Sequence, residues 1–353
     1  MLKKIVLFLI LALLCVLIYI SANSKIVRDF KDGKNINVLF ILDDTENNET
    51  IKFFVARYNS SNEYIKTVFV DENITILYKT KKARILKDMI LETKPENRIE
   101  FIKKEAEQLF DNNFSMDYYI CLDNKSLENI VKVFSKKEDL KTNLKLFNSI
   151  LQKDNYRDAN VVAAIKLLNY VYNNFNRFSF ISFIKELYNK NIIIQTNFEL
   201  KDLFLLYAYF LDENKTIKYA DIPTISRRKR IEIDTKNKEK IGEFINRNTV
   251  KEDNYLKIEV LNTTNKSRLA IKAVDKIREN NFDVVDWGAS SKKYEFTTIY
   301  DLVDNYEQVS KIKNILNCGE IIFKPQEKPL ADVTVFLGQD CTIYDKLDRE
   351  AKD

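Results

Sequence analysis

Apolar residues recur with two different periods in the last hundred residues of the chain. Short runs rich in β-branched residues at Ile258–Leu261, Phe282–Val285 and Val333–Leu337 are typical of strands. Between the first two runs, the apolar positions of Leu269–Ile277 fall on one face of a helix. A helix over 306–316 and a strand over 321–323 are also expected. The pattern predicts a small α/β domain over residues 257–341.

The preceding region mixes strand and helix patterns in the same way. Hydrophobic strands are predicted at Asn37–Leu42, Ile51–Tyr58 and Tyr64–Val70, separated by polar turns. This order predicts a larger α/β domain over residues 35–247, joined by a polar linker at 248–256. The remaining predicted elements are strands at 117–123, 217–223 and 229–233, the last two as a pair, and helices at 99–110, 127–134, 160–175, 178–188, 199–210 and 236–246.

The first residues resemble a targeting signal. Lys3 and Lys4 precede an uninterrupted apolar run from Ile5 to Ile20. Because Lys and Arg are retained on the cytoplasmic side, we expect a signal anchor or transmembrane helix over residues 1–22, with the rest of the chain outside the cytoplasm. The run is slightly shorter than the ~20 residues that span a bilayer, although its neighbours can extend it. A signal peptide cleaved near Ala22 is the alternative.

Composition and charge agree with an exported protein of two domains. The chain has 353 residues, of which 45% are hydrophobic and 12% aromatic, enough for more than one core. The net charge of +5 is spread through alternating basic and acidic residues, so no nucleic-acid partner is expected. Arg227–Arg230 is a basic cluster that we interpret as a solvated loop, with a site for an anionic lipid or polymer as the alternative. A polar tail follows at 342–353.

The residue inventory excludes several kinds of chemistry. The chain has no histidine, which removes His-based triads and the common zinc sites. Its four cysteines, one of them inside the apolar run, do not form a disulfide framework, and Cys318 and Cys341 have no nearby partner base. Gly-rich phosphate loops, Cys-x-x-Cys and Gly-x-Ser-x-Gly are missing. Aromatic-rich segments at Phe175–Phe180 and Phe204–Phe210 suggest a lipid tunnel, but stripes at helical spacing are usually core. We therefore expect no catalytic residue, metal site or cofactor.

The C-terminal segments resemble the C-terminal domain of LytR-CpsA-Psr proteins. That domain opens on a strand ending in Val-Leu-Asn-Gly-Thr, and continues through Phe-Asp-Val-Val and Thr-Thr strands to Asp-Val-Thr-Val-Val-Leu-Gly. Here these stand at Val260–Thr264, Phe282–Val285, Thr297–Ile299 and Asp332–Gly338, and Thr263 replaces the usual glycine. The resemblance implies a second, small α/β domain that acts in binding or docking, with a plain packing domain as the alternative.

The larger region resembles the catalytic domain of the same family. The matching segments are Leu42–Asp44, Asp117–Asp123, Ala164–Leu168 and Ala220–Pro223, in the family's order. The resemblance implies an α/β/α domain with a mixed sheet. The family's enzymes move an anionic glycopolymer from a polyprenyl-pyrophosphate carrier to the cell wall, which requires arginines on the pyrophosphate and carboxylates on a divalent metal.

Most of those basic residues are replaced in this chain. The family's Arg-Ala-Asp-Thr corresponds to Asn47–Thr50, and Pro-Arg-Asp-Thr corresponds to Val70–Asn73, so Asp71 stands where a cation belongs. Of the third basic motif, Arg157 remains. Charge neutralisation around a developing phosphate anion would therefore be lost. Asp44 and Glu49 offer two carboxylates for a hard cation, but a polar turn is the simpler interpretation.

The sequence thus predicts a membrane-anchored, extracytoplasmic envelope protein of LytR-CpsA-Psr type with a degenerate catalytic domain. Its expected role is non-catalytic binding of a wall polymer, a lipid-linked intermediate or an envelope partner protein. The alternative is an active metal-dependent phosphotransferase that attaches an anionic glycopolymer to the cell wall and uses magnesium or manganese. A chance resemblance of the N-terminal region also remains open. The expected location is the cytoplasmic membrane of a bacterium, with a single pass.

Overall fold

The structure is a computed structural model that describes residues 26–343, apart from 27, 30–31, 45–49, 60–63, 78–82, 111–113, 152–156, 175–176, 200–201, 203–214, 228–229, 247–254 and 327. The predicted anchor at 1–22, nearly all of the linker, most of the helix at 199–210 and most of the tail at 342–353 lie outside the described residues. Within the described part of the chain, no helix has both the length and the apolarity needed to cross a membrane.

The described chain alternates strands and helices, as its hydrophobic pattern predicts. The N-terminal elements are β1 (Ile36–Asp44), β2 (Thr50–Tyr58), β3 (Tyr64–Val70), β4 (Ile74–Leu77), β5 (Ala83–Ile85), α4 (Leu86–Glu92), α5 (Pro95–Phe110), β6 (Tyr118–Leu122), α6 (Asn124–Phe134), α7 (Leu140–Leu151), α8 (Arg157–Asn173), α9 (Arg177–Tyr188), β7 (Ile194–Thr196), β8 (Thr216–Asp221), β9 (Thr224–Arg227), β10 (Arg230–Ile233) and α11 (Thr235–Asn246). The C-terminal elements are β11 (Lys257–Asn262), α12 (Leu269–Glu279), β12 (Asp283–Ala289), β13 (Thr298–Asp301), α13 (Tyr306–Leu316), β14 (Glu320–Phe323) and β15 (Val333–Leu337).

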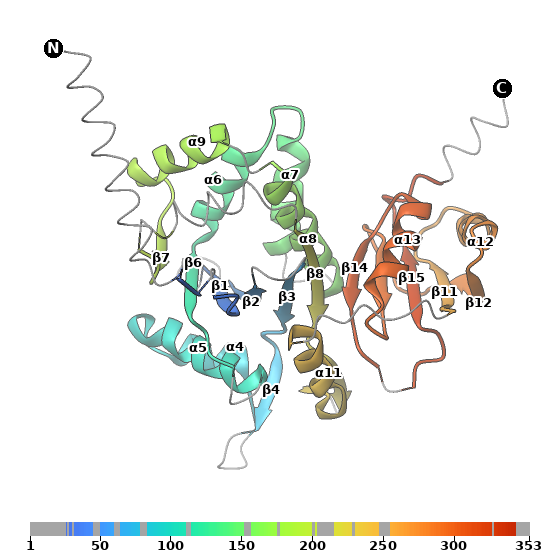
Figure 1. The fold of residues 1–353 in the computed structure, drawn as a ribbon, viewed down its shortest axis with the longest axis horizontal. Coiled ribbons are helices and arrows are strands. Elements are labelled where there is room, and N and C mark those ends of the chain that lie inside the picture. The colour runs from blue at the N-terminus through green and yellow to red at the C-terminus, as the bar shows by residue number, and fades with distance from the viewer. Residues whose placement is uncertain are drawn as a thin grey trace.

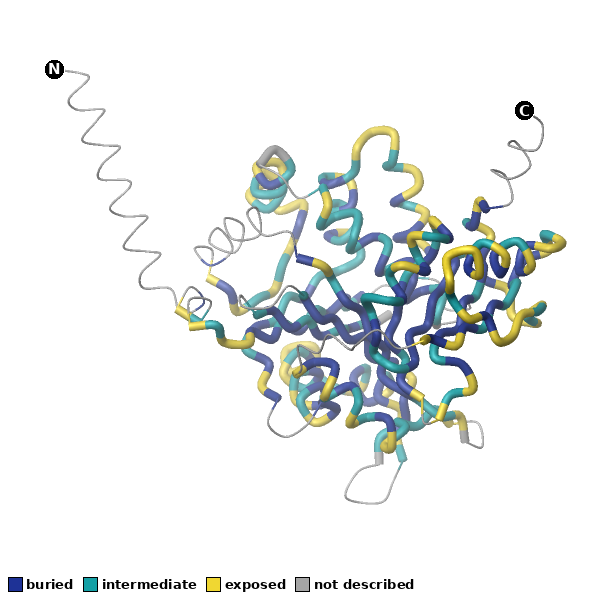
Figure 2. Tube along the Cα trace, turned by 45° about the vertical axis from the view of Figure 1, so that its right-hand side comes forward, coloured by how far each residue is buried: buried dark blue, intermediate teal, exposed yellow. Residues whose placement is uncertain are grey.

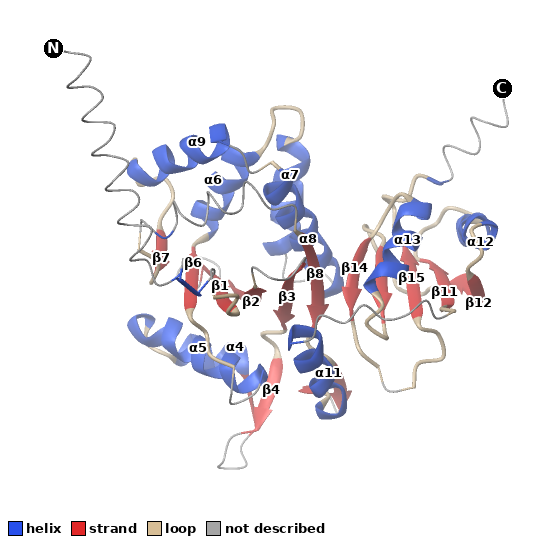
Figure 3. Ribbon diagram, viewed as in Figure 1, coloured by secondary structure: helices blue, strands red, loops and turns tan. Residues whose placement is uncertain are grey.

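A mixed sheet of eleven strands runs through the molecule in the order β12-β11-β15-β13-β14-β8-β3-β2-β1-β6-β7. In its N-terminal half, β2 lies antiparallel between β1 and β3, whereas β6 pairs parallel with β1, and β8 pairs parallel with β3. Helices α6 to α9 lie on one side of this half of the sheet, and α4, α5 and α11 lie on the other (Figures 1 and 3). The expected α/β/α arrangement with a mixed sheet is therefore present.

Both faces of the central strands are buried (Figure 2). Successive side chains of a strand point to opposite faces, so the odd-numbered Leu39 and Ile41 of β1 pack with Ile102 and Ala106 of α5 in one core. The even-numbered Phe40 of β1 faces the helices α6 to α9. A strand that is buried on both faces has a nearly continuous run of apolar residues in its sequence. This explains why β1, β2 and β3 were predicted.

The late strands differ from the sequence prediction. The expected pairing of strands 217–223 and 229–233 is wrong, because β8 lies in the large sheet and β10 lies in a separate sheet of four strands ordered β5-β4-β10-β9. The partner of β10 is β9, which the sequence analysis did not identify, and the two form an antiparallel pair. The run that contains β8 ends in Ile222-Pro223, and Pro223 has no N–H for a sheet, so the chain leaves the large sheet at that point.

The C-terminal strands form the other end of the large sheet. The predicted helices and strands of this region are all present, with five parallel or antiparallel strands and the helices α12 and α13. The sheet continues into the N-terminal half because β14 pairs parallel with β8, where Phe323 lies opposite Ala220. The predicted domain boundary at residues 248–256 stays a prediction.

Charged contacts reinforce this junction. Lys218 of β8 donates to Glu307 at 2.9 Å, and its ammonium group lies 3.6 Å from the ring centroid of Tyr64. On α8, Asp158 accepts from Tyr294 at 3.0 Å and from Lys324 at 3.3 Å. These partners of Lys218 and Asp158 include residues from both halves of the chain, so the contacts hold the C-terminal strands against β8 and α8.

We expect the charge of Asp158 to stabilise this junction. Burial by itself raises the pKa of Asp158, but Lys324 and the hydroxyl groups of Tyr300 and Tyr294 together outweigh burial and hold its pKa below the usual value. Stability from a depressed carboxyl pKa is present above the unfolded-state value near ~4, and is lost as the pH falls through the folded-state value. Replacing Asp158 by Asn should therefore lower the free energy of unfolding by about 1 to 3 kcal/mol at neutral pH.

Urea denaturation between neutral pH and pH ~3 measures this effect. The difference in the free energy of unfolding between the original protein and Asp158→Asn should shrink below pH ~4. Asp275→Asn, an exposed change on α12, is the matched control and should not alter stability at any pH. A constant difference for Asp158→Asn across the whole pH range would contradict the role of the charge.

Candidate apolar binding cavity

An apolar cavity of about 340 Å³ lies between the large sheet and the helices α6 to α9. Its floor is made by side chains of β1, β2, β3 and β6 that face these helices, and its roof by apolar residues of the helices. The floor includes Phe40, Leu42, Phe54, Phe69, Ile120 and Leu122, and the roof includes Leu127, Ile130, Val131, Phe134, Ile150, Ala164, Leu168, Val171 and Phe183.

Three aromatic rings form a row across the floor. Strand register places Phe40 opposite Phe54 and Phe54 opposite Phe69. The rings of Phe40 and Phe54 stack with centroids 4.8 Å apart, and those of Phe54 and Phe69 are tilted at 5.4 Å. Neighbouring rings on one face of a sheet hold each other in place, so the floor is a preformed apolar surface.

A single ion pair of the described residues lies in the cavity wall. Lys52 of β2 is opposite Leu42 of β1, and its Nζ atom lies 3.4 Å from Oε1 of Glu72. The two side chains retain 26% and 17% of their exposure, so water reaches both. The cavity therefore has an apolar interior and one charged, partly solvated end.

The acidic residues singled out from the sequence do not converge on this cavity as a group. Glu72 lines it, and Asp44 accepts a hydrogen bond from Asn124. Asp71 is buried and accepts from the backbone N–H and side chain of Asn73, at 2.9 and 3.2 Å, so it closes a turn. Glu49 and Asn47 lie outside the described residues, and Arg157 is the first residue of α8. The described carboxylates and thiols include no group of three that could hold a metal ion.

Sequence reasoning missed Lys52, the cation among the described residues that line the cavity. The signal was available, because Lys52 and Phe54 have the same parity in a strand and must share a face. The aromatic segment that ends at Phe180 was interpreted as core, and Phe180 is indeed buried; Phe183, one helical turn later, lines the cavity. The segment at 204–210 lies outside the described residues.

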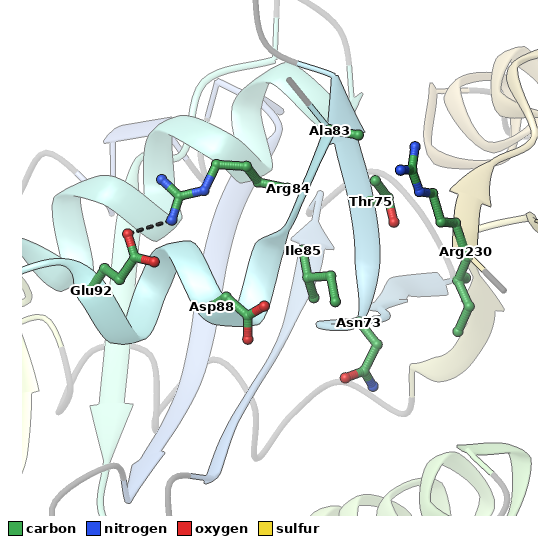
Figure 4. Close-up of a pocket in the computed structure, with 9 residues that line it drawn as sticks. Asn73, Thr75, Ala83, Arg84, Ile85, Asp88, Glu92 and Arg230 are labelled. Atoms are coloured by element: carbon green, nitrogen blue, oxygen red, sulfur yellow. Dashed lines mark ion pairs between the residues drawn. The ribbon is translucent and has the colours of Figure 1, made fainter. Parts of the chain in front are cut away.

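A second cavity, of about 580 Å³, lies on the small sheet and is shown in Figure 4. It is lined by both polar and apolar side chains, among them Arg230 from the basic cluster of the sequence analysis. Arg84 and Glu92 form an ion pair there, and Asp88 lies on the same wall. Its two arginines and two carboxylates balance, so it does not concentrate positive charge for an anionic polymer.

Comparison with known proteins gives a family for the C-terminal part. Residues 255–340 match the family described as LytR cell envelope-related transcriptional attenuator. No curated protein matches the chain.

Several solved structures are similar to this chain at low sequence identity. A transcriptional regulator from Enterococcus faecalis is 12% identical, with a TM-score of 0.46, over 64% of this chain and 88% of the other. A protein from Streptococcus agalactiae is 12% identical, with a TM-score of 0.48, over 62% and 88%. TagT from Bacillus subtilis is 8% identical, with a TM-score of 0.44, over 60% and 89%.

The family match covers the strands and helices from β11 to β15, where the sequence pattern predicted a LytR-type domain. That prediction is confirmed for this part of the chain. Residues 255–340 form a LytR C-terminal-type domain, of the kind found in LytR-CpsA-Psr envelope proteins.

Proposed function

We propose that this chain is a non-catalytic LytR-CpsA-Psr-type envelope protein whose apolar cavity holds the hydrocarbon part of a lipid-linked wall-polymer intermediate. The observation that carries the proposal is the apolar cavity with a charged pair at one end. It fits an amphiphile with a long apolar chain and an anionic head. The proposed location is the outer side of the cytoplasmic membrane, with residues 1–22 as the anchor.

The interior of the cavity supports binding of a hydrocarbon chain. Its floor and roof are apolar, and each methylene group that leaves water for such a surface contributes about 0.8 kcal/mol. The stacked rings of Phe40 and Phe54 are already ordered, so little side-chain entropy is lost when a ligand enters.

The charged end supports binding without transfer. An anionic head group near Lys52 must compete with the Glu72 carboxylate, which already neutralises the ammonium group. Stabilising a phosphoryl-transfer transition state requires positive charge held rigidly around the phosphate. Among the described residues that line the cavity, Lys52 is the cation, and one paired lysine does not meet that requirement.

The C-terminal domain supplies a separate surface suited to a wall polymer. Its edge strand β12 exposes Trp287, which retains 44% of its surface, and the Arg278 guanidinium lies 4.8 Å from the Trp287 ring centroid. An exposed indole held in place by a neighbouring cation offers a flat apolar face with a polar edge, the kind of surface that packs against sugar rings.

Two charge changes at the cavity should have opposite effects on binding a short-chain polyprenyl phosphate. Lys52→Gln should weaken binding several-fold, because the head group loses its cation. Glu72→Gln should strengthen it, because the competing carboxylate is removed. Titration calorimetry measures both, and the matching polyprenol, which lacks the phosphate, is the control ligand that neither change should affect. The same weakening of both ligands by Lys52→Gln would argue against a head-group contact.

Filling the cavity should block the ligand altogether. Ala164→Trp places a large side chain in the roof and should weaken binding of both polyprenyl ligands at least ~10-fold, at a stability cost of about 1 to 3 kcal/mol. Asn173→Trp, on the exposed last residue of α8, adds the same side chain away from the roof. Unchanged affinity in a folded Ala164→Trp protein would place the ligand elsewhere and reject the proposal.

No transfer of a glycan from a polyprenyl-pyrophosphate carrier is expected from the purified protein with magnesium or manganese. A chromatographic assay for released carrier tests this prediction. Turnover that disappears in Glu49→Gln or Asp71→Asn would instead support the rival metal-dependent phosphotransferase.

Trp287→Ala should reduce co-sedimentation of the full chain with purified cell-wall fragments several-fold. Ile271→Ala removes a side chain of similar exposure on α12 and should leave co-sedimentation unchanged. Equal losses in both variants, or in neither, would remove Trp287 from the polymer-binding surface.

A further inference from the structure

Two thiols that are far apart in the sequence meet in the C-terminal domain. Cys318 follows the end of α13 and Cys341 follows β15, and their Sγ atoms lie 2.8 Å apart. Both are free cysteines in this structure. A disulfide bond has sulfurs ~2.05 Å apart, so bonding requires a closing movement of less than ~1 Å. The sequence analysis saw no disulfide framework, because nothing in the spacing shows which strand ends are neighbours.

The loops that carry the two thiols are fixed to the same residue. Thr297, which is fully buried, accepts from the Glu320 backbone N–H at 3.1 Å and donates its own N–H to the Asp340 carboxylate at 2.6 Å. Its hydroxyl group accepts from the Gly338 N–H at 3.0 Å. One buried threonine therefore holds the residue two positions after Cys318 and the residue before Cys341.

Two glycines permit this close approach, Gly319 directly after Cys318 and Gly338 three residues before Cys341. A Cβ atom at Gly338 would lie 2.3 Å from the carbonyl carbon of Phe296, and 2.5 Å from the nitrogen of Thr297. Gly319, immediately after Cys318, has a φ of +97°, and a Cβ there would lie 2.9 Å from Thr297 Cγ2. A residue with a side chain at either position would push the loops apart. The short sulfur separation is therefore built into the surrounding backbone.

We propose that Cys318 and Cys341 form a reversible disulfide bond by exchange with an external low-molecular-weight disulfide. Cys341 is fully buried and Cys318 is partly exposed, so the external disulfide reaches Cys318 first. The Cys318 thiolate attacks one external sulfur and releases one thiolate, leaving a mixed disulfide. The Cys341 thiolate then attacks Cys318 Sγ and releases the second. The two cysteines lose two protons and two electrons, and the external disulfide becomes two thiols.

The surroundings of Cys341 suit it to the second step. In the reduced pair Cys318 Sγ donates to Cys341 Sγ, and this hydrogen bond lowers the pKa of the Cys341 thiol against the effect of burial and raises the pKa of Cys318. Cys318 must therefore lose its proton to solvent before it attacks, and the hydrogen bond is gone once Cys318 carries the mixed disulfide. Lys266, whose ammonium group donates to the Cys341 carbonyl oxygen at 3.2 Å, adds a nearby positive charge. Cys341 is thus the resolving thiol of the pair.

The bond would close a loop that contains β14 and β15. β14 is the strand that pairs with β8, and Asp340, next to Cys341, forms an ion pair with Lys166 of α8 at 2.8 Å. Oxidation would therefore tie together two of the segments through which the C-terminal domain contacts the rest of the chain. Closing a loop of this length should raise the melting temperature by on the order of 5 to 10 °C.

The full chain, reduced and then equilibrated with oxidised glutathione, tests the proposal. Intact-mass measurement after denaturation and alkylation should show four reactive thiols before treatment and two after it, and non-reducing peptide mapping should link Cys318 to Cys341. The oxidised protein should melt at the higher temperature, and dithiothreitol should reverse the shift. Retention of four thiols would overturn the proposal.

Matched variants separate this bond from other thiol chemistry. Cys318→Ser should form no internal disulfide bond and should show no rise in melting temperature. Cys121→Ser removes a buried thiol of β6 and should show both the internal disulfide bond and the rise in melting temperature. Cys341→Ser should stop at a glutathione adduct on Cys318. An adduct that persists on Cys318 in the unmodified chain would show that Cys341 does not resolve it, and would overturn the proposal. These outcomes do not depend on the proposed ligand of the cavity.

Discussion

The fixed register of β1, β2 and β3 is the constraint on which the rest of the structure depends. Side chains alternate between the faces of a sheet, so a slip of one residue would move every side chain of a strand to the other face. In the observed register, Phe40, Phe54 and Phe69 form one row beneath the helices α6 to α9. Alternate residues of the same strands, such as Leu39 and Ile41, build the opposite core with α5. The pairing of these three strands therefore places the residues of the cavity on one face of the sheet and those of the main core on the other.

Helix α8 links the cavity to the C-terminal domain. Ala164 and Leu168 line the cavity, while Asp158 and Lys166 on the same helix contact Lys324 and Asp340 of the C-terminal domain. The shared core adds to this connection, since Phe244 of α11 stacks on Phe323 of β14 with ring centroids 5.2 Å apart. A movement of the C-terminal domain would therefore shift α8, and with it the residues of α8 that line the cavity.

The electrostatics of the cavity are those on which the proposed non-catalytic role depends. Its charged end consists of Lys52 and Glu72, which neutralise each other. Asp71 accepts hydrogen bonds from Asn73 and closes a turn. An apolar interior with a balanced entrance lowers the cost of desolvating a neutral chain, and provides little stabilisation for a developing negative charge.

The sequence by itself determined the alternation of elements and the nature of the C-terminal domain. Strands such as β1 and β15 and helices such as α12 were predicted, because the local hydrophobic periodicity indicates which face of an element is buried. The short strands β4, β5, β7 and β9 were not predicted, since three or four residues carry little pattern, although β10 and β14 of the same length were predicted.

Only the tertiary structure decided which faces and ends meet. The pairing of β8 with β14, the place of Lys52 beside the aromatic floor and the meeting of Cys318 with Cys341 all join residues that are distant along the chain. Periodicity describes one element at a time, whereas these contacts depend on strand order and on close approach at Gly319 and Gly338. Strand order is set by the packing of the whole sheet, and that information is not local to any segment.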